Sequence, residues 1–467
     1  MALSPTMRNE KRTYFSPLCG ELRRDTPVRK FAGIHVPHHK NTTDMAPEAL
    51  PVPKTVTLPM SMHSGAPANI VVAPGDFVKL GQIVGEAVGA VSAPVHASVS
   101  GKVREITEIM LSSGRKSAAV VLESDGLQEP TPDLVPHPVE SMEQFIAAIR
   151  DSGAVGLGGA GYPTAAKFAV KEPARVEVIL INGAECEPYV TTDARAMVDD
   201  AELLIEGART LRRFFTNCKV LIGIEENKPQ AISELTRRCA QEDSVEVRKL
   251  PSLYPQGSKN ALLYSLTGKI VPEGGRLTDA GALIVNCATL VTVMRYIKTG
   301  MPFVSRCITV DGPAVISPKN VIVPLGTAIS EVLDFCRVPP KRIRKLVVGG
   351  PMMGVAIPDA DMPIIKYNNG ILAFREVDVT AARTTACIRC GRCMRACPMN
   401  LMPLQFESAF LLKKPEELGR LKVNMCIECG SCAYSCPAAR PLVQEIRLGK
   451  TMLRNFQAKN EGSGVKK

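Results

Sequence analysis

The run Cys387-Ile-Arg-Cys390-Gly-Arg-Cys393-Met-Arg-Ala-Cys397-Pro398 decides the fold of the C-terminal part, and its spacing returns in Cys426-Ile-Glu-Cys429-Gly-Ser-Cys432-Ala-Tyr-Ser-Cys436-Pro437. Thiolates three residues apart on a tight turn wrap an iron–sulfur cubane. Zinc is the alternative, since CxxC pairs also build four-cysteine zinc sites. Zinc needs two pairs per ion, however, and not two four-cysteine runs that each close on proline. The sequence therefore predicts two [4Fe–4S] clusters and single-electron transfer.

The two runs are expected to share their ligands. In two-cluster ferredoxins, the fourth cysteine of each run binds the cluster of the other run. This rule assigns one cluster to Cys387, Cys390, Cys393 and Cys436, and the second cluster to Cys426, Cys429, Cys432 and Cys397. The crossed pattern would keep the two clusters close enough for electron hopping.

Length and composition limit the number of domains, the compartment and the class of partner. The 467 residues suggest three or four domains. No apolar stretch reaches the roughly 20 residues of a membrane span, and the N-terminus lacks an apolar signal core, so we expect a cytosolic protein with reduced cysteines. The net charge of +11 is diffuse and without an aromatic-studded basic stretch. It disfavours nucleic acid and fits an acidic protein or an anionic membrane surface better.

Upstream of the cysteines, strand-like and helix-like segments alternate. Apolar strands are predicted at 175–181 and 219–224, and helices at 194–215 and 230–241, which favours an α/β layer with a largely parallel sheet. Residues 303–357 are β-rich, with a short helix at 329–336. Residues 27–126 are also β-like, with frequent Gly and Pro.

The β-like N-terminal part resembles the barrel-sandwich hybrid fold of lipoyl and biotinyl carriers. Its Gly75-Asp and Gly81-Gln turns and the later Ser100-Gly-Lys-Val carry this resemblance. Carriers display a modified lysine between the two halves of the fold, but the corresponding stretch, 87–92, has no lysine. We therefore interpret this domain as a docking module.

A glycine-rich loop, Gly156-Leu-Gly158-Gly159-Ala-Gly161-Tyr162, precedes a predicted helix that carries Lys167. Such a loop brings backbone N–H groups close to an anion, and a helix N-terminus adds a favourable field. The alternative is a plain tight turn. The loop is neither a Walker loop nor a Rossmann fingerprint, because it lacks the Gly-Lys-Ser/Thr ending and follows no obvious strand.

Polar clusters follow three predicted strands. They are Asn182-Gly-Ala-Glu185-Cys-Glu187, Glu225-Glu226-Asn227-Lys228 and Asn286-Cys287. The carboxyl edge of a parallel sheet is where ligands bind, so these clusters suggest one pocket. Helix N-caps are the alternative for Asn227 or Asp193, but not for every glutamate.

Together, GLGGAGYPT-x-x-K, NGAECEP and VNCATL resemble the flavin- and NADH-binding motifs of the flavoprotein subunit of respiratory complex I. The resemblance implies FMN and NAD(H) as cofactors. It implies contacts to FMN from Gly156, Gly158, Gly159, Gly161, Lys167, Asn182, Glu185, Glu226 and Asn286. Tyr162 and Glu187 fall where the relative contacts the nicotinamide dinucleotide. Ala184 replaces an aspartate of the complex I motif, so that contact with the flavin is absent or supplied elsewhere, and the choice between Glu225 and Glu226 is open.

The order of the domains is similar to that of the RnfC family. The predicted division is an N-terminal arm at 1–26, a barrel-sandwich hybrid at 27–128, an FMN/NAD-binding α/β domain at 138–300, a β-grasp (SLBB) domain at 303–360, a two-cluster ferredoxin-type domain at 375–455 and a basic tail at 456–467.

This resemblance implies a peripheral subunit on the cytoplasmic face of the membrane. Its partners would be integral membrane subunits and a ferredoxin-accepting iron–sulfur subunit of an ion-translocating ferredoxin:NAD oxidoreductase. Flavin would convert the two-electron hydride of NADH into the single electrons that clusters carry. The alternatives are an RnfC-like cobalamin reductase, and a non-enzymatic electron-transfer scaffold whose glycine loop is empty. All six histidines lie at or before His137, which excludes a histidine-based mechanism in the flavin and cluster regions.

Overall fold

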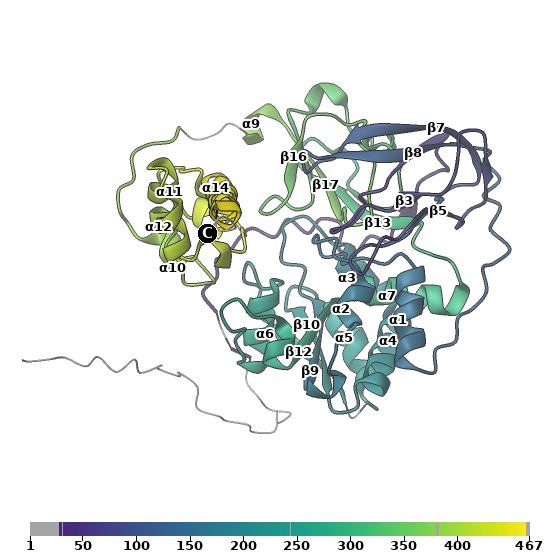
Figure 1. Cartoon of the computed structure of the whole chain (residues 1–467), viewed down its shortest axis with the longest axis horizontal. Helices are drawn as coiled ribbons and strands as arrows, with labels where there is room; N and C mark the ends of the chain where they lie inside the picture. The colour runs from purple at the N-terminus through teal and green to yellow at the C-terminus, as the bar shows by residue number, and fades with distance from the viewer. Residues whose placement is uncertain (1–27, 30, 243, 380–382, 464–467) are drawn as a thin grey trace, which may run out of the picture.

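A computed structural model describes residues 28–29, 31–242, 244–379 and 383–463 (Figure 1). The predicted arm at 1–26 and the last four residues of the predicted tail lie outside these ranges. In Figure 1 an α/β layer, two β-rich parts above it and a small helical C-terminal part to the side can be distinguished. The short 3₁₀ helices are η1 (Pro173–Arg175), η2 (Leu277–Ala280), η3 (Pro340–Arg342) and η4 (Val423–Met425).

The N-terminal part consists of two small sheets that face one core. Its strands are β2 (Thr55–Pro59), β3 (Asn69–Ile70), β4 (Phe77–Val78), β5 (Ile83–Glu86), β6 (Val95–His96), β7 (Gly101–Met110) and β8 (Lys116–Ser124). They pair in the orders β2-β8-β7-β4 and β3-β5-β6. Alternate residues of β2, such as Val56 and Leu58, are fully buried in this core, as the period of two in a strand dictates. Val155 and Leu157 of the glycine-loop region pack into the same core.

The middle part is a four-stranded parallel sheet in the order β11-β10-β9-β12. Its strands are β9 (Val178–Gly183), β10 (Lys219–Glu225), β11 (Val245–Leu250) and β12 (Ala282–Asn286). Its helices are α1 (Met142–Asp151), α2 (Thr164–Phe168), α3 (Thr192–Asp199), α4 (Ala201–Phe214), α5 (Pro229–Cys239), α6 (Lys259–Thr267) and α7 (Cys287–Thr299). The predicted parallel α/β layer is confirmed. The single helix predicted at 194–215 is instead two helices, because Asp200 leaves helical geometry (φ −112°, ψ 26°) and pairs with Arg295.

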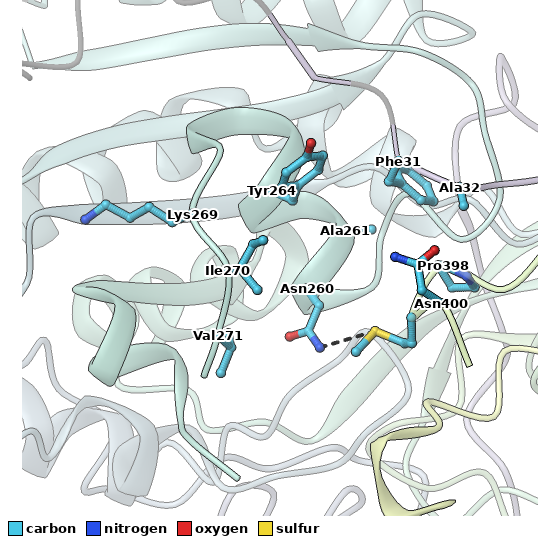
Figure 2. A pocket seen from close by; sticks show the side chains of 11 residues that line it. Phe31, Ala32, Asn260, Ala261, Tyr264, Lys269, Ile270, Val271, Pro398 and Asn400 are labelled. Carbon is cyan, nitrogen blue, oxygen red and sulfur yellow. Dashed lines mark hydrogen bonds between the residues drawn. The ribbon is translucent and has the colours of Figure 1, made fainter. Parts of the chain in front are cut away.

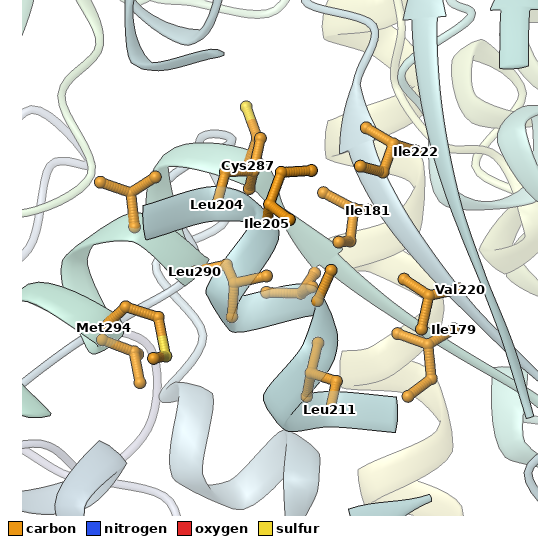
Figure 3. Close-up of a cluster of buried hydrophobic side chains, with 14 of the residues drawn as sticks. Ile179, Ile181, Leu204, Ile205, Leu211, Val220, Ile222, Cys287, Leu290 and Met294 are labelled. Carbon is orange, nitrogen blue, oxygen red and sulfur yellow. The ribbon is translucent and has the colours of Figure 1, made fainter. Parts of the chain in front are cut away.

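The main core lies between this sheet and helices α4 and α7 (Figure 3). Ile179, Ile181, Val220 and Ile222 project from β9 and β10 toward the helices. Gly207 lets α4 approach α7 closely, since a Cβ at this position would lie 2.6 Å from Leu290 Cγ. This packing thus fixes α4 and α7 against the sheet.

A third sheet is mixed and has six strands in the order β1-β14-β13-β17-β15-β16. The strands are β1 (Glu48–Ala49), β13 (Ser305–Asp311), β14 (Lys319–Pro324), β15 (Lys345–Val348), β16 (Val355–Ile357) and β17 (Gly370–Phe374), with helix α8 (Ile329–Phe335) between β14 and β15. The sheet continues past the predicted boundary at residue 360. It also takes β1 from the range that we assigned to the hybrid domain, because β1 pairs in parallel with β14.

The C-terminal part is helical. After α9 (Glu376–Val379) it contains α10 (Arg392–Arg395), α11 (Pro403–Leu411), α12 (Pro415–Arg420), α13 (Ser431–Tyr434) and α14 (Leu442–Ser463). Because α14 continues to Ser463, residues 456–463 belong to a helix and not to the predicted tail. Among the described residues, no helix combines the length and the apolarity needed to cross a bilayer.

Candidate functional site

The glycine loop forms an open cradle between β12 and α2. Gly156 N donates to Tyr162 O at 2.8 Å, and Gly161 N donates to Gly156 O at 3.0 Å, so the loop closes on itself. Gly158 and Gly159 remain exposed at its tip. A Cβ on Gly159 would meet no atom within 4 Å, and one on Gly158 would come only to 3.8 Å from Asn286 Nδ2. The space above this backbone is therefore free for a ligand.

Lys167 supplies a positive charge at the helix that follows the cradle. It lies on α2 and is partly buried. Burial and the nearby Lys259 lower the pKa of Lys167 to about 8. Within the described part of the chain, no hydrogen bond or ion pair neutralises its ammonium group. A partly buried, uncompensated cation beside an exposed glycine loop fits a phosphate.

Asn182 is the penultimate residue of β9 and Asn286 is the last residue of β12, and the two stand opposite each other in the sheet register. Asn182 Nδ2 donates to Gly257 O at 2.9 Å, which ties β9 to the segment before α6. Asn286 caps α7 and donates from Nδ2 to Asp193 Oδ2 at 2.6 Å. Burial, and then the charge of Glu185, raises the pKa of Asp193 to about 7. The predicted edge pocket is thus backed by a buried carboxyl whose pKa is raised by burial and by the neighbouring Glu185.

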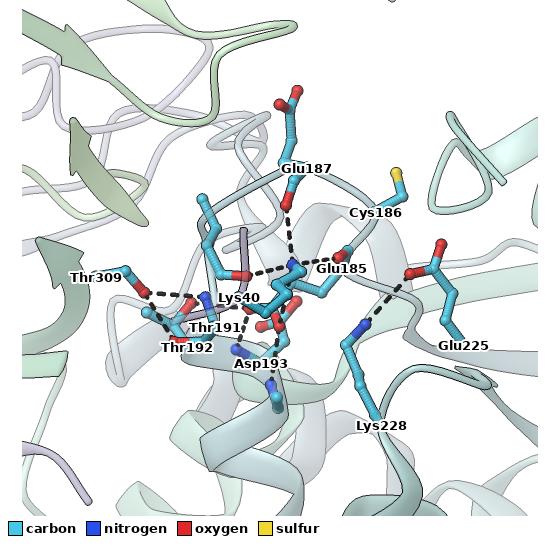
Figure 4. Close-up of polar contacts among 12 residues, drawn as sticks. Lys40, Glu185, Cys186, Glu187, Thr191, Thr192, Asp193, Glu225, Lys228 and Thr309 are labelled. Carbon is cyan, nitrogen blue, oxygen red and sulfur yellow. Dashed lines mark hydrogen bonds and ion pairs between the residues drawn. The ribbon is translucent and has the colours of Figure 1, made fainter. Parts of the chain in front are cut away.

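Glu185 is held below this edge by a network that the sequence did not predict (Figure 4). Its carboxylate accepts from the backbone N–H of Asp193 (2.6 Å) and Ala194 (3.2 Å) at the start of α3. Lys40 reaches in from the N-terminal part and donates to the carbonyls of Glu185 and Glu187, both at 2.8 Å. In this structure the Glu185 carboxylate therefore orders the edge of the sheet.

Glu187 connects the flavin-type domain to the third sheet and to the cysteine runs. Its carboxylate accepts from Met352 N (3.0 Å) and Met353 N (2.9 Å). The buried Tyr254 hydroxyl lies 3.4 Å from Glu187 Oε1 and donates to Cys429 O at 2.7 Å. Burial raises the pKa of Glu187, although the two backbone donors oppose this effect. The Glu187 carboxylate, which was predicted to contact the nicotinamide dinucleotide, is thus hydrogen-bonded to protein groups in this structure.

Tyr162 and Glu226 take different positions from the other predicted residues. The Tyr162 side chain is exposed at the end of the glycine loop, so it is free to meet a ligand. Glu226 is exposed and accepts from Ser252 N at 3.5 Å, away from the cradle. Glu225, the last residue of β10, is buried and pairs with the buried Lys228 at 3.2 Å. Of the two glutamates, Glu225 is therefore the buried one.

The eight cysteines line two separate cavities in the combination that the crossed rule predicts. One cavity is lined by Cys387, Cys390, Cys393 and Cys436, and the other by Cys397, Cys426, Cys429 and Cys432. Gly391 and Gly430 adopt φ values of +72° and +83°, which a side chain disfavours.

Among the residues that the structure describes, no three His, Cys, Asp or Glu side chains converge closely enough to hold a single metal ion.

The second cavity faces the flavin-type domain. Cys429 is buried and packs with Tyr254 and Val36. Pro398 and Asn400, just after Cys397, share a groove with α6 residues, and Asn260 Nδ2 lies 3.5 Å from Met399 Sδ (Figure 2). Cys387 and Cys390 of the first cavity are exposed instead. The cavity of Cys397, Cys426, Cys429 and Cys432 is thus the inner one, and the cavity of Cys387, Cys390, Cys393 and Cys436 the outer one.

Sequence reasoning missed Lys40, Tyr254 and Asp193 as parts of the site. Lys40 bonds to residues about 150 positions away, so no local pattern could have indicated it. Tyr254 begins the segment Tyr254-Pro-Gln-Gly257, and the turn-forming Pro and Gly of this segment were the available local signal. The arrangement as a whole fits FMN at the cradle, where Cβ atoms are absent and Lys167 lacks a counter-charge, and one cluster in each cavity.

Comparison with known proteins agrees with this geometry. Family models match the RnfC barrel sandwich hybrid domain at 29–127, the Nuo51 FMN-binding domain at 149–295 and the 4Fe-4S dicluster domain at 386–440. The hybrid, FMN and dicluster parts of the predicted fold are therefore confirmed, as are FMN and [4Fe–4S] clusters as the cofactors.

Three curated relatives, each an RnfC subunit, are similar over most of their length. The RnfC subunit of the proton-translocating ferredoxin:NAD(+) oxidoreductase complex of Clostridium ljungdahlii is 38% identical, over 79% of this chain and 82% of the relative. That of the Na(+)-translocating complex of Acetobacterium woodii is 38% identical, over 80% and 85%. That of the ion-translocating oxidoreductase complex of Rhodobacter capsulatus is 36% identical, over 93% and 85%. These relatives support the RnfC prediction over the cobalamin-reductase and scaffold alternatives, and the chain belongs to the RnfC family of ion-translocating oxidoreductase subunits.

Proposed function

We propose that this chain passes electrons between NAD(H) and the other subunits of an ion-translocating ferredoxin:NAD oxidoreductase complex. FMN, when bound, exchanges a two-electron hydride with NAD(H) and single electrons with the clusters. The observation that carries the proposal is the direct contact from the cradle domain to the inner cluster cavity through Glu187, Tyr254 and Cys429.

The predicted pocket residues divide by role, with Glu225 in place of Glu226. Gly158 and Gly159 present backbone to FMN, and Gly156 and Gly161 close the loop on itself. Lys167 holds the FMN phosphate, and Asn182 and Asn286 orient the flavin at the edge of the sheet. Tyr162 and Glu187 contact NAD(H). Glu185 orders the edge of the sheet through its hydrogen bonds to the start of α3. Glu225 takes the place that we expected for Glu226. The chain supplies binding, orientation and exclusion of water.

Cys397, Cys426, Cys429 and Cys432 would hold the cluster on the flavin side, and Cys387, Cys390, Cys393 and Cys436 would hold the one that a partner subunit can approach. Bound there, the two clusters would supply single-electron carriers between the flavin and the partner. The outer thiols Cys387 and Cys390 are exposed, whereas Cys397, Cys429 and Cys432 are buried. The chain is attached peripherally through the complex, on the cytoplasmic face of the membrane, where NAD(H) is available.

The third sheet is a β-grasp domain of the SLBB type. Strands β14, β13, β17 and β15 lie side by side in that order, the neighbours β13 and β17 run parallel, and α8 connects the two halves. In this proposal the β-grasp domain also takes in β1 and residues 361–374, and the cluster domain also takes in residues 456–463.

Cofactor analysis and NADH titration of the anaerobically purified full chain test the function. We expect released FMN, about eight iron atoms per chain, and NADH-driven bleaching of the cluster absorbance. Protein that contains clusters but binds no FMN and does not react with NADH would overturn the proposal. Reduction of cob(III)alamin that depends on NADH and exceeds reduction of a ferredoxin would favour the cobalamin-reductase alternative.

A further inference from the structure

The glycine loop is fixed by residues that lie outside the flavin domain. Ser64 of the hybrid domain donates from Oγ to Ala160 O and from its backbone N–H to Gly161 O, both at 2.8 Å. Ser64 stands inside the segment His63-Ser-Gly-Ala-Pro67, which the proposed function leaves unexplained. Two of the loop's carbonyls are therefore bonded by the neighbouring domain.

On the other side, Arg306 of β13 holds the loop from the third sheet. Its Nη2 donates to Leu157 O at 3.0 Å, and its Nε donates to Asn368 O at 2.7 Å. The side chain is buried, with 3% of the residue exposed. A guanidinium is planar and always charged, so two such bonds fix its direction. Thr289 of α7 completes the bonding of Leu157 by accepting from its N–H at 2.9 Å.

A buried lysine joins the same three domains just behind the loop. Lys366 is fully buried and donates to Pro94 O of the hybrid domain (2.5 Å) and Gly153 O of the flavin domain (2.8 Å). The adjacent Tyr367 ring packs on Gly161, where a Cβ would lie 2.6 Å from Tyr367 Cδ1. Among the described residues, the loop is thus hydrogen-bonded to the flavin domain outside its own segment through Thr289, and to the hybrid domain and the third sheet through Ser64 and Arg306.

We propose that Ser64 and Arg306 are positioning residues for FMN. This inference rests on the proposed function. Ser64 and Arg306 bind the carbonyls of Leu157, Ala160 and Gly161, so these carbonyls point toward the neighbouring domains. The backbone of Gly158 and Gly159 then stays exposed for the flavin. The flavin site is then complete only when the three domains are docked. The hybrid domain, which lacks a carrier lysine, acts as a brace for the flavin loop.

The test measures FMN binding to the full chain with its clusters intact, by quenching of flavin fluorescence, for wild type, Arg306→Gln, Arg306→Lys and Ser64→Ala. Removing a hydrogen bond from a charged donor should raise the FMN Kd on the order of tenfold in Arg306→Gln. Arg306→Lys should recover part of this loss, and Ser64→Ala should raise the Kd about threefold, as expected for a neutral hydrogen bond. Arg344→Gln is the matched control, since Arg344 belongs to the same sheet domain, is exposed and forms a surface ion pair with Glu376.

Thermal unfolding and iron content separate binding from folding. Variants that melt well above the assay temperature, keep their iron and still bind FMN as wild type does would overturn the proposal. Should Arg306→Gln not fold, Arg306→Lys and Ser64→Ala decide in the same way. Wild-type protein that binds no FMN would overturn the proposed function itself, whereas wild-type binding with unchanged variants overturns only the positioning role.

Discussion

Lys167 shows how one side chain determines an anion site. The ammonium group has no counter-charge among the described residues and stands beside Lys259. We predict that Lys167→Ala weakens FMN binding roughly 10- to 100-fold, the loss expected when a charge-assisted hydrogen bond worth about 1.5–3 kcal/mol is removed. Lys167→Arg keeps the charge and should retain most of the affinity. Equilibrium dialysis measures both, and full flavin content with full NADH activity in Lys167→Ala would show that the pocket is misplaced.

The same lysine predicts a pH dependence. Its pKa in the FMN-free protein is about 8, so the ammonium is charged below this pH and neutral above it. The FMN phosphate is a dianion above about pH 6. Affinity should therefore be highest between these two values and fall as the pH rises through 8. Fluorescence titrations from pH 6.5 to 9.5 check this, and Lys167→Arg should flatten the decline because guanidinium stays charged.

The cysteine ligands and the glycine cradle could be predicted because each signal is local. Fixed spacing determines how thiolates wrap a cluster, and the structure places the eight cysteines in the predicted combination. The choice between Glu225 and Glu226 was open from the sequence, because two adjacent glutamates at a strand end carry no signal for which of them is buried; in the structure Glu225 is buried and Glu226 is exposed. Lys40, Ser64 and Arg306 could not be predicted, since only the tertiary fold brings them to the site.

At the scale of elements, the crossed assignment predicts that each cysteine run supplies one ligand to the cluster of the other run. Cys436→Ser should remove the outer cluster although Cys436 belongs to the second run, and Cys397→Ser should remove the inner cluster although it belongs to the first. Each variant should retain about four of the eight iron atoms. Iron analysis and electron paramagnetic resonance of the reduced protein distinguish the two losses. Retention of the outer signal in Cys436→Ser would contradict the crossed assignment.

Helices and strands could be predicted wherever the sequence has a clear hydrophobic pattern. The strands that precede the polar clusters and the helix α5 are found where they were expected, since buried parallel strands form continuous apolar runs. The short strand β1 was missed, because two residues carry no periodic signal and its partner β14 is about 270 positions away. The break at Asp200 was missed as well, because the apolar pattern continues across it from α3 into α4.

At the scale of the whole molecule, Tyr254 couples the flavin domain to the inner cluster. Tyr254→Phe leaves the buried Cys429 carbonyl without its donor, which costs roughly 1–3 kcal/mol and loosens the contact. We predict slower electron transfer from flavin to clusters, while FMN affinity and NADH oxidation by the flavin remain near wild type. Stopped-flow spectroscopy resolves the two steps.

Tyr264→Phe provides the control for this measurement. Tyr264 lies on α6, near the same domain contact, and its hydroxyl has no hydrogen bond among the residues that the structure describes. It should leave both steps unchanged. Equal cluster reduction rates in Tyr254→Phe, Tyr264→Phe and wild type would show that electrons do not depend on this contact.

The exchange of fourth ligands between the two cysteine runs has a consequence for how the protein is made. During synthesis Cys387, Cys390 and Cys393 leave the ribosome well before Cys436, so the outer ligand set is incomplete until the second run has emerged as well. A chain that stops between the two runs has three of the four outer ligands and one of the four inner ligands. Under the crossed assignment, neither ligand set is therefore complete until the second run has been made.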